Sequence, residues 1–310
     1  MSLLVTGSIG IDTVETPSGK VEGVLGGSAV YFAAAASFFT PVRFVAVAGE
    51  DMPPKFLSPL ERLGNIDLSG LEIRKGSKTF RWAGRYHADV NVRDTLDTQL
   101  NVLAEAGPSI PAAFRDSRHV FLANTHPDLQ AELLSQLRGP RLVVADTMNL
   151  WIENERQALL RLMGSIDGLV LNDSEARLLT GLTNTVAAGK AVAGLVRRFV
   201  VVKKGEHGSL LFVDGKVCAL PAYPAVNVVD PTGAGDCFAG AMMGYLAAAG
   251  TYDAQSLLAG MAYGTIVASL ELEGFSLEHL QVIRRGDIED RFAEFVAMTR
   301  ICPSVQAEKL

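Results

Sequence analysis

The sequence predicts an α/β protein with a mostly parallel sheet covered by helices on both faces. Short runs rich in β-branched residues alternate with longer amphipathic segments. These runs are apolar throughout, as strands buried on both faces are. Strand followed by helix, repeated along the chain, favours a parallel sheet between two helical layers. The 310 residues, 48% of them hydrophobic, suffice for a sizeable core.

Each element of this fold has a segment that predicts it. The strands are expected at 2–9, 42–50, 118–124, 141–146, 168–173 and 199–205. The amphipathic segments between and after them predict helices at 127–137, 153–164, 234–250, 254–271 and 288–299. From about residue 234 onward the pattern is almost all helical.

Two segments do not suit the middle of such a sheet. Residues 13–26 are polar and carry a Pro-Ser-Gly turn, and residues 77–96 alternate apolar and polar side chains. Alternation is typical of a half-exposed strand. On pattern alone, the two segments are either one small antiparallel flap or two separate surface hairpins.

Composition limits the partners and the compartment. The net charge of −6 disfavours nucleic acid, because phosphate binding wants a basic surface. Cys218, Cys237 and Cys302 form no CxxC pair, which disfavours a disulfide framework or a zinc site. The first residues lack a signal-peptide pattern, and no apolar run reaches the roughly 18 residues of a membrane span. We expect a soluble, cytoplasmic protein without nucleic-acid or membrane partners.

The stretch "VVDPTGAGDCFAG" at 228–240 carries the strongest chemical signal. A glycine-rich turn leads into a predicted helix, whose first N–H groups have no intrahelical partner. Gly233, Ala234 and Gly235 therefore predict a backbone site for an anion. The P-loop pattern is absent, and Phe238 replaces the third glycine of the dinucleotide fingerprint, which argues against an oxidoreductase.

Asp236 follows these glycines at the predicted helix start. A carboxylate there either complements the helix dipole or takes a proton from a hydroxyl that attacks a phosphoryl group. The second role needs an acceptor alcohol, ATP and a divalent cation. The position beside a predicted phosphate cradle favours that role.

Together with further motifs, this stretch resembles the ribokinase family of carbohydrate and nucleoside kinases, also called the PfkB family. The resemblance covers essentially the whole chain, through "GSIGID", "LGGSAVYFAAAAS", "ADTMNLW", "LNDSEA", "VVKKGEHGSL" and "DPTGAGD" in order. It implies a ribokinase-like three-layer α/β/α sandwich over residues 1–310 as a single domain. Residues 13–26 and 77–96 would form its β-sheet lid.

The resemblance also implies roles for individual residues. Asp236 would be the catalytic base, and the backbone of Gly233, Ala234 and Gly235 the anion hole. The implied acceptor site consists of Asp12, Gly26, Gly27, Tyr31, Trp82 and Asn149. The implied nucleotide site consists of Asn172, Lys203, Gly205, Gly208 and Thr232, with Glu175 for the metal. ATP and Mg²⁺ would be the cofactors, a monovalent cation stays open, and two lids would pair in a homodimer.

Three departures from the family pattern bear on the acceptor. Tyr31 and Phe32 stand where many sugar kinases have Asn, the lid carries Trp82, and Lys203 replaces a frequent Thr. The rings of Tyr31, Phe32 and Trp82 either pack in the core or line a pocket for a flat group. Lys203 either reaches a phosphate or lies in solvent at the end of a strand. A small sugar or polyol is the first expectation for the acceptor, and an adenosine-type nucleoside is the alternative. A catalytically silent nucleotide- or metabolite-binding protein is the third.

Overall fold

A nine-stranded sheet forms the centre of the computed structural model, which describes residues 2–300. Seven adjacent strands are parallel, and β12 and β13 add an antiparallel edge. In sheet order the strands are β13 (Lys216–Leu220), β12 (Ser209–Val213), β11 (Phe199–Lys203), β10 (Gly168–Asn172), β9 (Leu142–Asp146), β8 (His119–Leu122), β1 (Leu3–Thr6), β4 (Val42–Gly49) and β5 (Ile66–Arg74).

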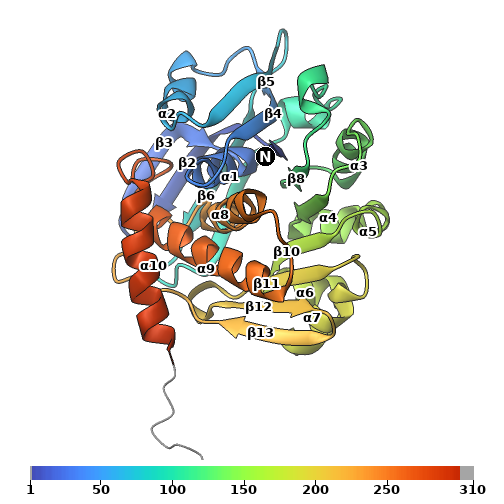
Figure 1. The fold of residues 1–310 in the computed structure, drawn as a ribbon. Coiled ribbons are helices and arrows are strands. Elements are labelled where there is room, and N and C mark those ends of the chain that lie inside the picture. The colour runs from blue at the N-terminus through green and yellow to red at the C-terminus, as the bar shows by residue number, and fades with distance from the viewer. Residues whose placement is uncertain (1, 301–310) are drawn as a thin grey trace, which may run out of the picture.

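Helices cover both faces of this sheet, so the predicted three-layer fold is confirmed (Figure 1). One face carries α1 (Ser28–Ser37), α2 (Leu57–Arg62), α8 (Ala234–Ala249), α9 (Ala254–Glu271) and α10 (Arg285–Thr299). The other face carries α3 (Pro127–Ser135), α4 (Asn149–Asn154), α5 (Arg156–Met163), α6 (Asp173–Thr180) and α7 (Thr185–Ala193). Short 3₁₀ turns lie at Pro54–Phe56, Asn101–Ala104, Ala112–Phe114 and Gly205–His207.

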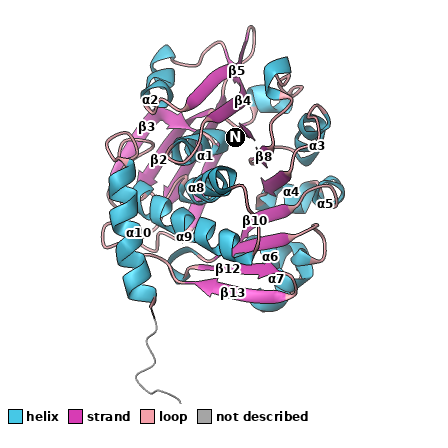
Figure 2. Ribbon diagram, in the orientation of Figure 1, coloured by secondary structure: helices cyan, strands magenta, loops and turns pink. Residues whose placement is uncertain are grey.

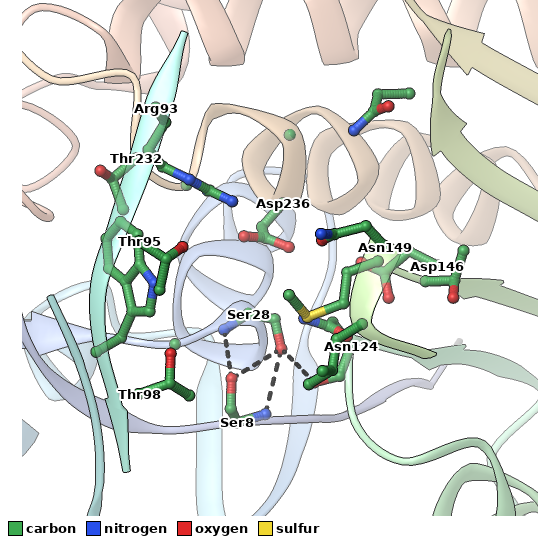
Figure 3. A pocket seen from close by; sticks show the side chains of 18 of the residues that line it. Ser8, Ser28, Arg93, Thr95, Thr98, Asn124, Asp146, Asn149, Thr232 and Asp236 are labelled. Atoms are coloured by element: carbon green, nitrogen blue, oxygen red, sulfur yellow. Dashed lines mark hydrogen bonds between the residues drawn. The ribbon is translucent and has the colours of Figure 1, made fainter. Parts of the chain in front are cut away.

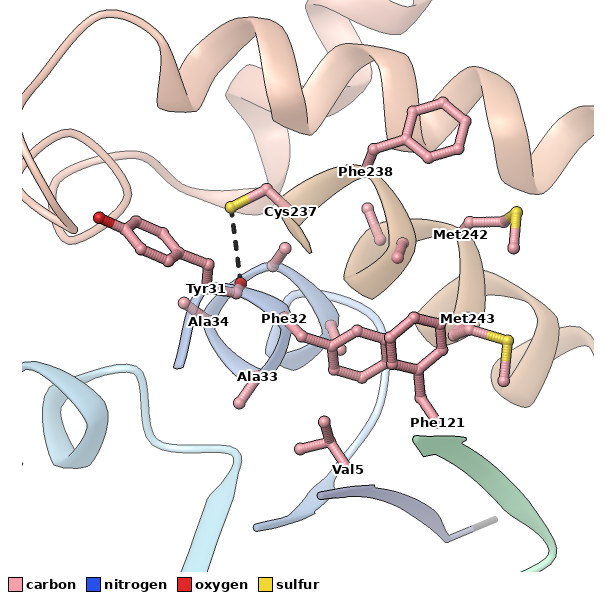
Figure 4. Close-up of a cluster of buried hydrophobic side chains, with 14 of the residues drawn as sticks. Val5, Tyr31, Phe32, Ala33, Ala34, Phe121, Cys237, Phe238, Met242 and Met243 are labelled. Carbon is pink, nitrogen blue, oxygen red and sulfur yellow. Dashed lines mark hydrogen bonds between the residues drawn. The ribbon is translucent and has the colours of Figure 1, made fainter. Parts of the chain in front are cut away.

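The continuous apolar strands reflect burial on both sides. Leu3 and Val5 enter the core under α1, α8 and α9, and Leu4 enters the core on the opposite face. Successive side chains of a strand point to opposite faces, so both sets must be apolar. Figure 4 shows the first core, where the Phe32 ring stacks on Phe121 with centroids 4.3 Å apart.

A second sheet of four strands forms the predicted lid, called the lid sheet below. Its order is β3 (Gly19–Gly26), β2 (Gly10–Thr16), β6 (Phe80–Tyr86) and β7 (Arg93–Gln99). The two polar segments therefore belong to one sheet rather than to separate hairpins. Its central pair, β2 and β6, is parallel, which corrects the expectation of an antiparallel flap. Because α1, β4 and β5 intervene between these strands, no hairpin fixes their direction.

Several elements escaped the sequence prediction. These are the strands β5, β12 and β13 and the helices α1, α2, α6 and α7, all labelled in Figure 2. The predicted helix at 153–164 is two helices, α4 and α5, with Glu155 between them outside helical geometry.

Within residues 2–300, no helix has both the length and the apolarity to cross a membrane. Cys218 and Cys237 are free thiols, and Cys302 lies outside the described residues. The organisation of 1–310 as a single domain stays a prediction.

Candidate active site

A cleft of about 1500 Å³ lies between the lid sheet and the ends of the central strands. Its floor comes from residues just after β1, β8, β9, β10 and β11, and its other wall comes from the lid (Figure 3). Parallel strands present their carboxyl ends at one edge, which is where open α/β sheets bind ligands. The cleft is therefore the candidate site. Of the sequence-predicted residues, it is lined by Asp12, Gly27, Tyr31, Trp82, Asn149, Asn172, Glu175, Lys203, Thr232, Gly233, Gly235 and Asp236.

Residues 228–236, called the anion loop below, turn the chain into α8. Gly233 adopts φ +90°, and a Cβ on it would lie 2.3 Å from the Tyr31 ring, so only glycine fits here. A Cβ on Gly235 would lie 2.6 Å from Lys203 Nζ. The N-terminal N–H groups of α8 thus meet the cleft without side chains in the way. This geometry suits an anion.

Asp236 stands in the first turn of α8 and faces the cleft (Figure 3). Removal of the carboxyl from water, together with the negative charge of Glu175, raises the pKa of Asp236 to about 7. The positive charges of Lys203 and Arg93 oppose this rise. A carboxyl with a pKa near neutrality is suited to accept and release protons at physiological pH.

Asp146, Glu175 and Lys203 lie around Asp236. Burial raises the pKa of Asp146 well above its ordinary value, and Oδ1 of this residue has no hydrogen-bond partner in the described structure. Burial also raises the pKa of Glu175. Lys203 Nζ donates to the Gly235 carbonyl at 3.3 Å, and its charge favours the ionised form of all three carboxyls. Lys203 therefore points into the site rather than into solvent.

Asn172 and Glu175 form a capping box at the start of α6. Asn172 Oδ1 accepts the Glu175 N–H, and Glu175 Oε2 accepts the Asn172 N–H, both at 2.8 Å. The box fixes the Glu175 side chain at the cleft and leaves Oε1 for another partner. Asn149 also lines the cleft, as the first residue of α4.

Asp12, on the lid strand β2, is 3% exposed, and its Oδ1 has no hydrogen-bond partner in the described structure. Burial raises its pKa to about 7, helped by the negative charges of Asp230 and Asp236. A Cβ on Gly26 would lie 1.8 Å from Asp12 Oδ2, and Gly27 has φ +110° with Ser8 O 2.5 Å from an added Cβ. Gly26 thus leaves the space that the Asp12 carboxyl occupies, and Gly27 allows its backbone to approach that of Ser8.

The two aromatic residues that follow these glycines, Tyr31 and Phe32, lie in different surroundings. Phe32 is fully buried and stacks in the core, so it does not line the cleft. Tyr31 lines the cleft but is 1% exposed, and its ring lies against Gly233. Its hydroxyl has no hydrogen-bond partner among the described residues. Helix periodicity turns these neighbours in different directions, and the sequence alone did not tell which would face the ligand.

The lid contributes Trp82 and Arg93 to the cleft. The Arg93 guanidinium lies 5.1 Å from the Trp82 ring, and a Cβ on Gly84 would lie 2.1 Å from that ring. Two arginines of β6, Arg81 and Arg85, instead pair with Asp51 and Glu15 outside the cleft. Strand alternation is the reason, because odd residues of β6 face away from Trp82.

Two of the predicted nucleotide residues do not line the cleft. Gly205 and Gly208 flank the turn after β11, with φ of +54° and +81°. A Cβ on Gly208 would lie 2.1 Å from the Leu220 carbonyl oxygen, which explains this glycine without a ligand. Their role in nucleotide binding stays a prediction. Gly26 and Ala234 lie directly beside lining residues.

Arg93 is the main site residue that sequence reasoning missed. It lies within the predicted lid segment, and the spacing from Arg93 to Thr95, both at the cleft, could have indicated a shared face. Asn124 and Asp146, which follow predicted strands, also reach the cleft. Trp151 Nε1 donates to Asn124 Oδ1 at 2.8 Å and so orients this amide.

Several known proteins are similar to this chain in sequence. The model of the pfkB family carbohydrate kinases matches residues 129–279. A cytidine kinase from Thermococcus kodakarensis is 32% identical over 250 residues, which cover 78% of this chain and 87% of that protein. A ribokinase from Arabidopsis thaliana is 31% identical over 250 residues, covering 73% and 63%.

Solved structures show the same fold. The nucleoside kinase of Burkholderia thailandensis in complex with inosine has a TM-score of 0.75 at 19% identity, covering 95% of this chain and 99% of that one. Arabidopsis thaliana ribokinase with ribose and ATP has a TM-score of 0.73 at 22% identity, covering 94% and 98%. The similarity to the cytidine kinase extends over most of both chains, and the family model matches the region that contains the anion loop. This chain therefore belongs to the PfkB family of carbohydrate kinases.

Proposed function

We propose that this kinase transfers the γ-phosphoryl group of ATP to a hydroxyl of a nucleoside. The observation that carries the proposal is the placement of Asp236 beside the bare backbone of Gly233 and Gly235 in one cleft with Trp82. A carboxylate next to a helix N-terminus provides a base and a site for the transferring oxygens together.

In the proposed reaction, Asp236 takes the proton of the acceptor hydroxyl. The acceptor oxygen forms a bond to the γ-phosphorus as the bond from that phosphorus to the leaving oxygen of ADP breaks. The N–H groups at the start of α8 stabilise the charge on the phosphoryl oxygens. Lys203 from β11 and Arg93 from β7 would neutralise the remaining negative charge from opposite sides of the cleft.

The residues at α6 fit a magnesium ion. Glu175 has one oxygen in the capping box and a second that can accept from a metal-bound water. Mg²⁺ favours one or two carboxylates together with phosphate oxygens and water, and it would neutralise charge on the ATP phosphates. No group of three or more metal-ligating side chains gathers within residues 2–300, which is compatible with that mode of binding. Asn172 and Thr232 would contribute polar contacts to the nucleotide.

A buried acidic region behind the anion loop fits a monovalent cation. Both carboxylate oxygens of Glu271 are buried without a hydrogen-bond partner in the described structure, and Asp230 is fully buried nearby. Burial and the charge of Asp230 raise the pKa of Glu271 well above its ordinary value. A cation there would offset this negative charge, and turnover measured in potassium-free buffer tests the assignment.

The acceptor is the finer part of the proposal. Trp82 at the cleft supplies a flat surface on which a base can stack. The cytidine kinase similarity over most of the chain and the fold of the inosine-bound nucleoside kinase support a nucleoside as well. Asp12, Gly27 and Asn149 would hold the ribose hydroxyls. A free sugar is the second candidate, because Phe32 packs in the core and the floor of the cleft is polar.

The outer edge of β7 supports the proposal of a homodimer through the lid. All seven residues of this strand are exposed, and β7 is the terminal strand of its sheet. An open strand edge favours pairing with another chain. Sedimentation of the wild type and of Leu96→Lys, with its side chain 51% exposed on that edge strand, tests this assembly.

A screen of ATP consumption tests the acceptor. We expect turnover with cytidine, inosine or another nucleoside, and a lower kcat/KM with ribose, fructose and inositol. A preference for a free sugar would replace the nucleoside proposal. ATP binding without turnover on every acceptor would instead support a catalytically silent binding protein.

A further inference from the structure

The lid sheet is bonded directly to the anion loop. The Thr232 hydroxyl donates to Tyr86 Oη at 3.2 Å, and both side chains are largely buried. The Thr16 hydroxyl donates to the Val229 carbonyl at 2.8 Å. The Ser18 hydroxyl donates to the Val228 carbonyl at 3.2 Å. Three lid residues thus hold the segment that leads to Gly233 and α8.

Two of these contacts, those of Thr16 and Tyr86, lie on the same two strands as the proposed acceptor residues Asp12 and Trp82. In the parallel pair of β2 and β6, Asp12 is opposite Trp82, and Glu15 is opposite Arg85. Thr16 and Tyr86 follow one residue later on the two strands. At about 3.3 Å per residue, the acceptor contacts and the anion-loop contacts lie roughly 13 Å apart along one paired element.

The Tyr86 hydroxyl interacts with Thr232 and with Arg93. Burial raises the pKa of Tyr86, and the positive charge of Arg93 opposes this rise. Asp230 Oδ1 already accepts the Thr232 N–H at 2.8 Å, which fixes the backbone but leaves the hydroxyl to Tyr86. A shift of the lid would therefore change the contact of the Thr232 side chain, one residue before Gly233.

We propose that Tyr86 is a positioning residue that couples the lid to the anion loop. When the acceptor binds between Asp12 and Trp82, β2 and β6 hold Thr16 and Tyr86 against the anion loop, and the loop takes the geometry that phosphoryl transfer needs. Tyr86 acts through Thr232 and does not contact the transferring group. The inference rests on the proposed kinase reaction and adds that the lid controls the anion loop as well as access to the cleft.

A double-mutant cycle tests the coupling. We expect Tyr86→Phe and Thr232→Val each to lower kcat about 3- to 10-fold, as the loss of one hydrogen bond does, with the acceptor KM changed less than about 2-fold. The double variant should be no slower than the slower single variant, because both remove the same bond. Tyr223→Phe is the matched control, since its hydroxyl donates to Glu294 on the surface and Tyr223 does not line the cleft.

A second measurement does not depend on turnover. Amide hydrogen exchange of peptides covering 228–236 should be faster in Tyr86→Phe than in the wild type, with exchange in α5 unchanged. Fold changes in kcat that multiply in the double variant, or unchanged exchange in 228–236, would overturn the coupling. A loss confined to acceptor KM would also overturn it, because Tyr86 would then be an acceptor contact.

The proposed function fails in a different way. It fails when the wild type turns over no acceptor, whereas the coupling fails when an active wild type and Tyr86→Phe have equal kcat and equal exchange. Equal exchange in the two proteins overturns the coupling even where no acceptor is found.

Discussion

The anion loop lies in nine consecutive residues, whereas the proposed acceptor end of the cleft combines Asp12, Trp82 and Asn149 from three distant segments. The loop depends on backbone geometry at the start of one helix, with Gly233 in a conformation that favours glycine. The acceptor end depends on how the lid sheet packs over the central sheet. The difference between the two ends of the cleft indicates that the proposed reaction type depends on one local motif, the anion loop. The choice of acceptor depends on contacts between distant segments.

Within the anion loop, removing the proposed base should have the largest effect on kcat. We expect Asp236→Asn to lower kcat about 10³-fold, because the acceptor hydroxyl loses its proton acceptor. ATP affinity should change little, since the backbone of the anion loop remains. Asp290→Asn, exposed on α10, is the control. A kcat within about 10-fold of the wild type would refute the assignment of the base.

The two glycines of the loop should differ from each other. Gly233→Ala should lower kcat about 10²-fold, because φ is +90° and a Cβ would lie 2.3 Å from the Tyr31 ring. Gly235→Ala should cost less than about 10-fold, because its Cβ meets only the flexible end of Lys203. Steady-state kinetics of both variants measures the difference. Equal losses would mean that backbone strain does not set the loop geometry.

At the acceptor end, Trp82→Ala should affect binding rather than the chemical step. Loss of one stacking surface should raise the KM for a nucleoside about 10-fold and leave kcat within about 3-fold. Trp82→Phe should recover part of the affinity. The KM for ribose, which has no base, is the internal reference, and an equal rise for both acceptors would show that Trp82 does not contact a base.

The smallest expected effect concerns stability at Asp12. Its pKa of about 7 in the folded state lies above the ordinary aspartate value of 3.8, so the folded protein binds this proton more tightly than the unfolded chain. This contribution to stability is complete below pH 3.8 and is lost as the pH rises through 7. Relative to the wild type, Asp12→Asn should gain about 3 kcal/mol in free energy of unfolding between pH 5 and pH 8. Urea denaturation at both pH values measures it, and a constant difference would contradict the raised pKa.

By itself, the sequence determined the layered fold, the anion loop and the residues expected at it, because apolar strands, glycine turns and helix starts are local properties. Tertiary structure decided the rest. Arg93 lines the cleft and Arg81 does not, because alternate side chains of the lid strands face opposite sides. Tyr31 lies against Gly233 and Phe32 packs on Phe121, because the two side chains leave α1 in different directions. The bond between Tyr86 and Thr232 joins residues 146 positions apart. Such contacts depend on the packing of distant strands, which no local pattern encodes.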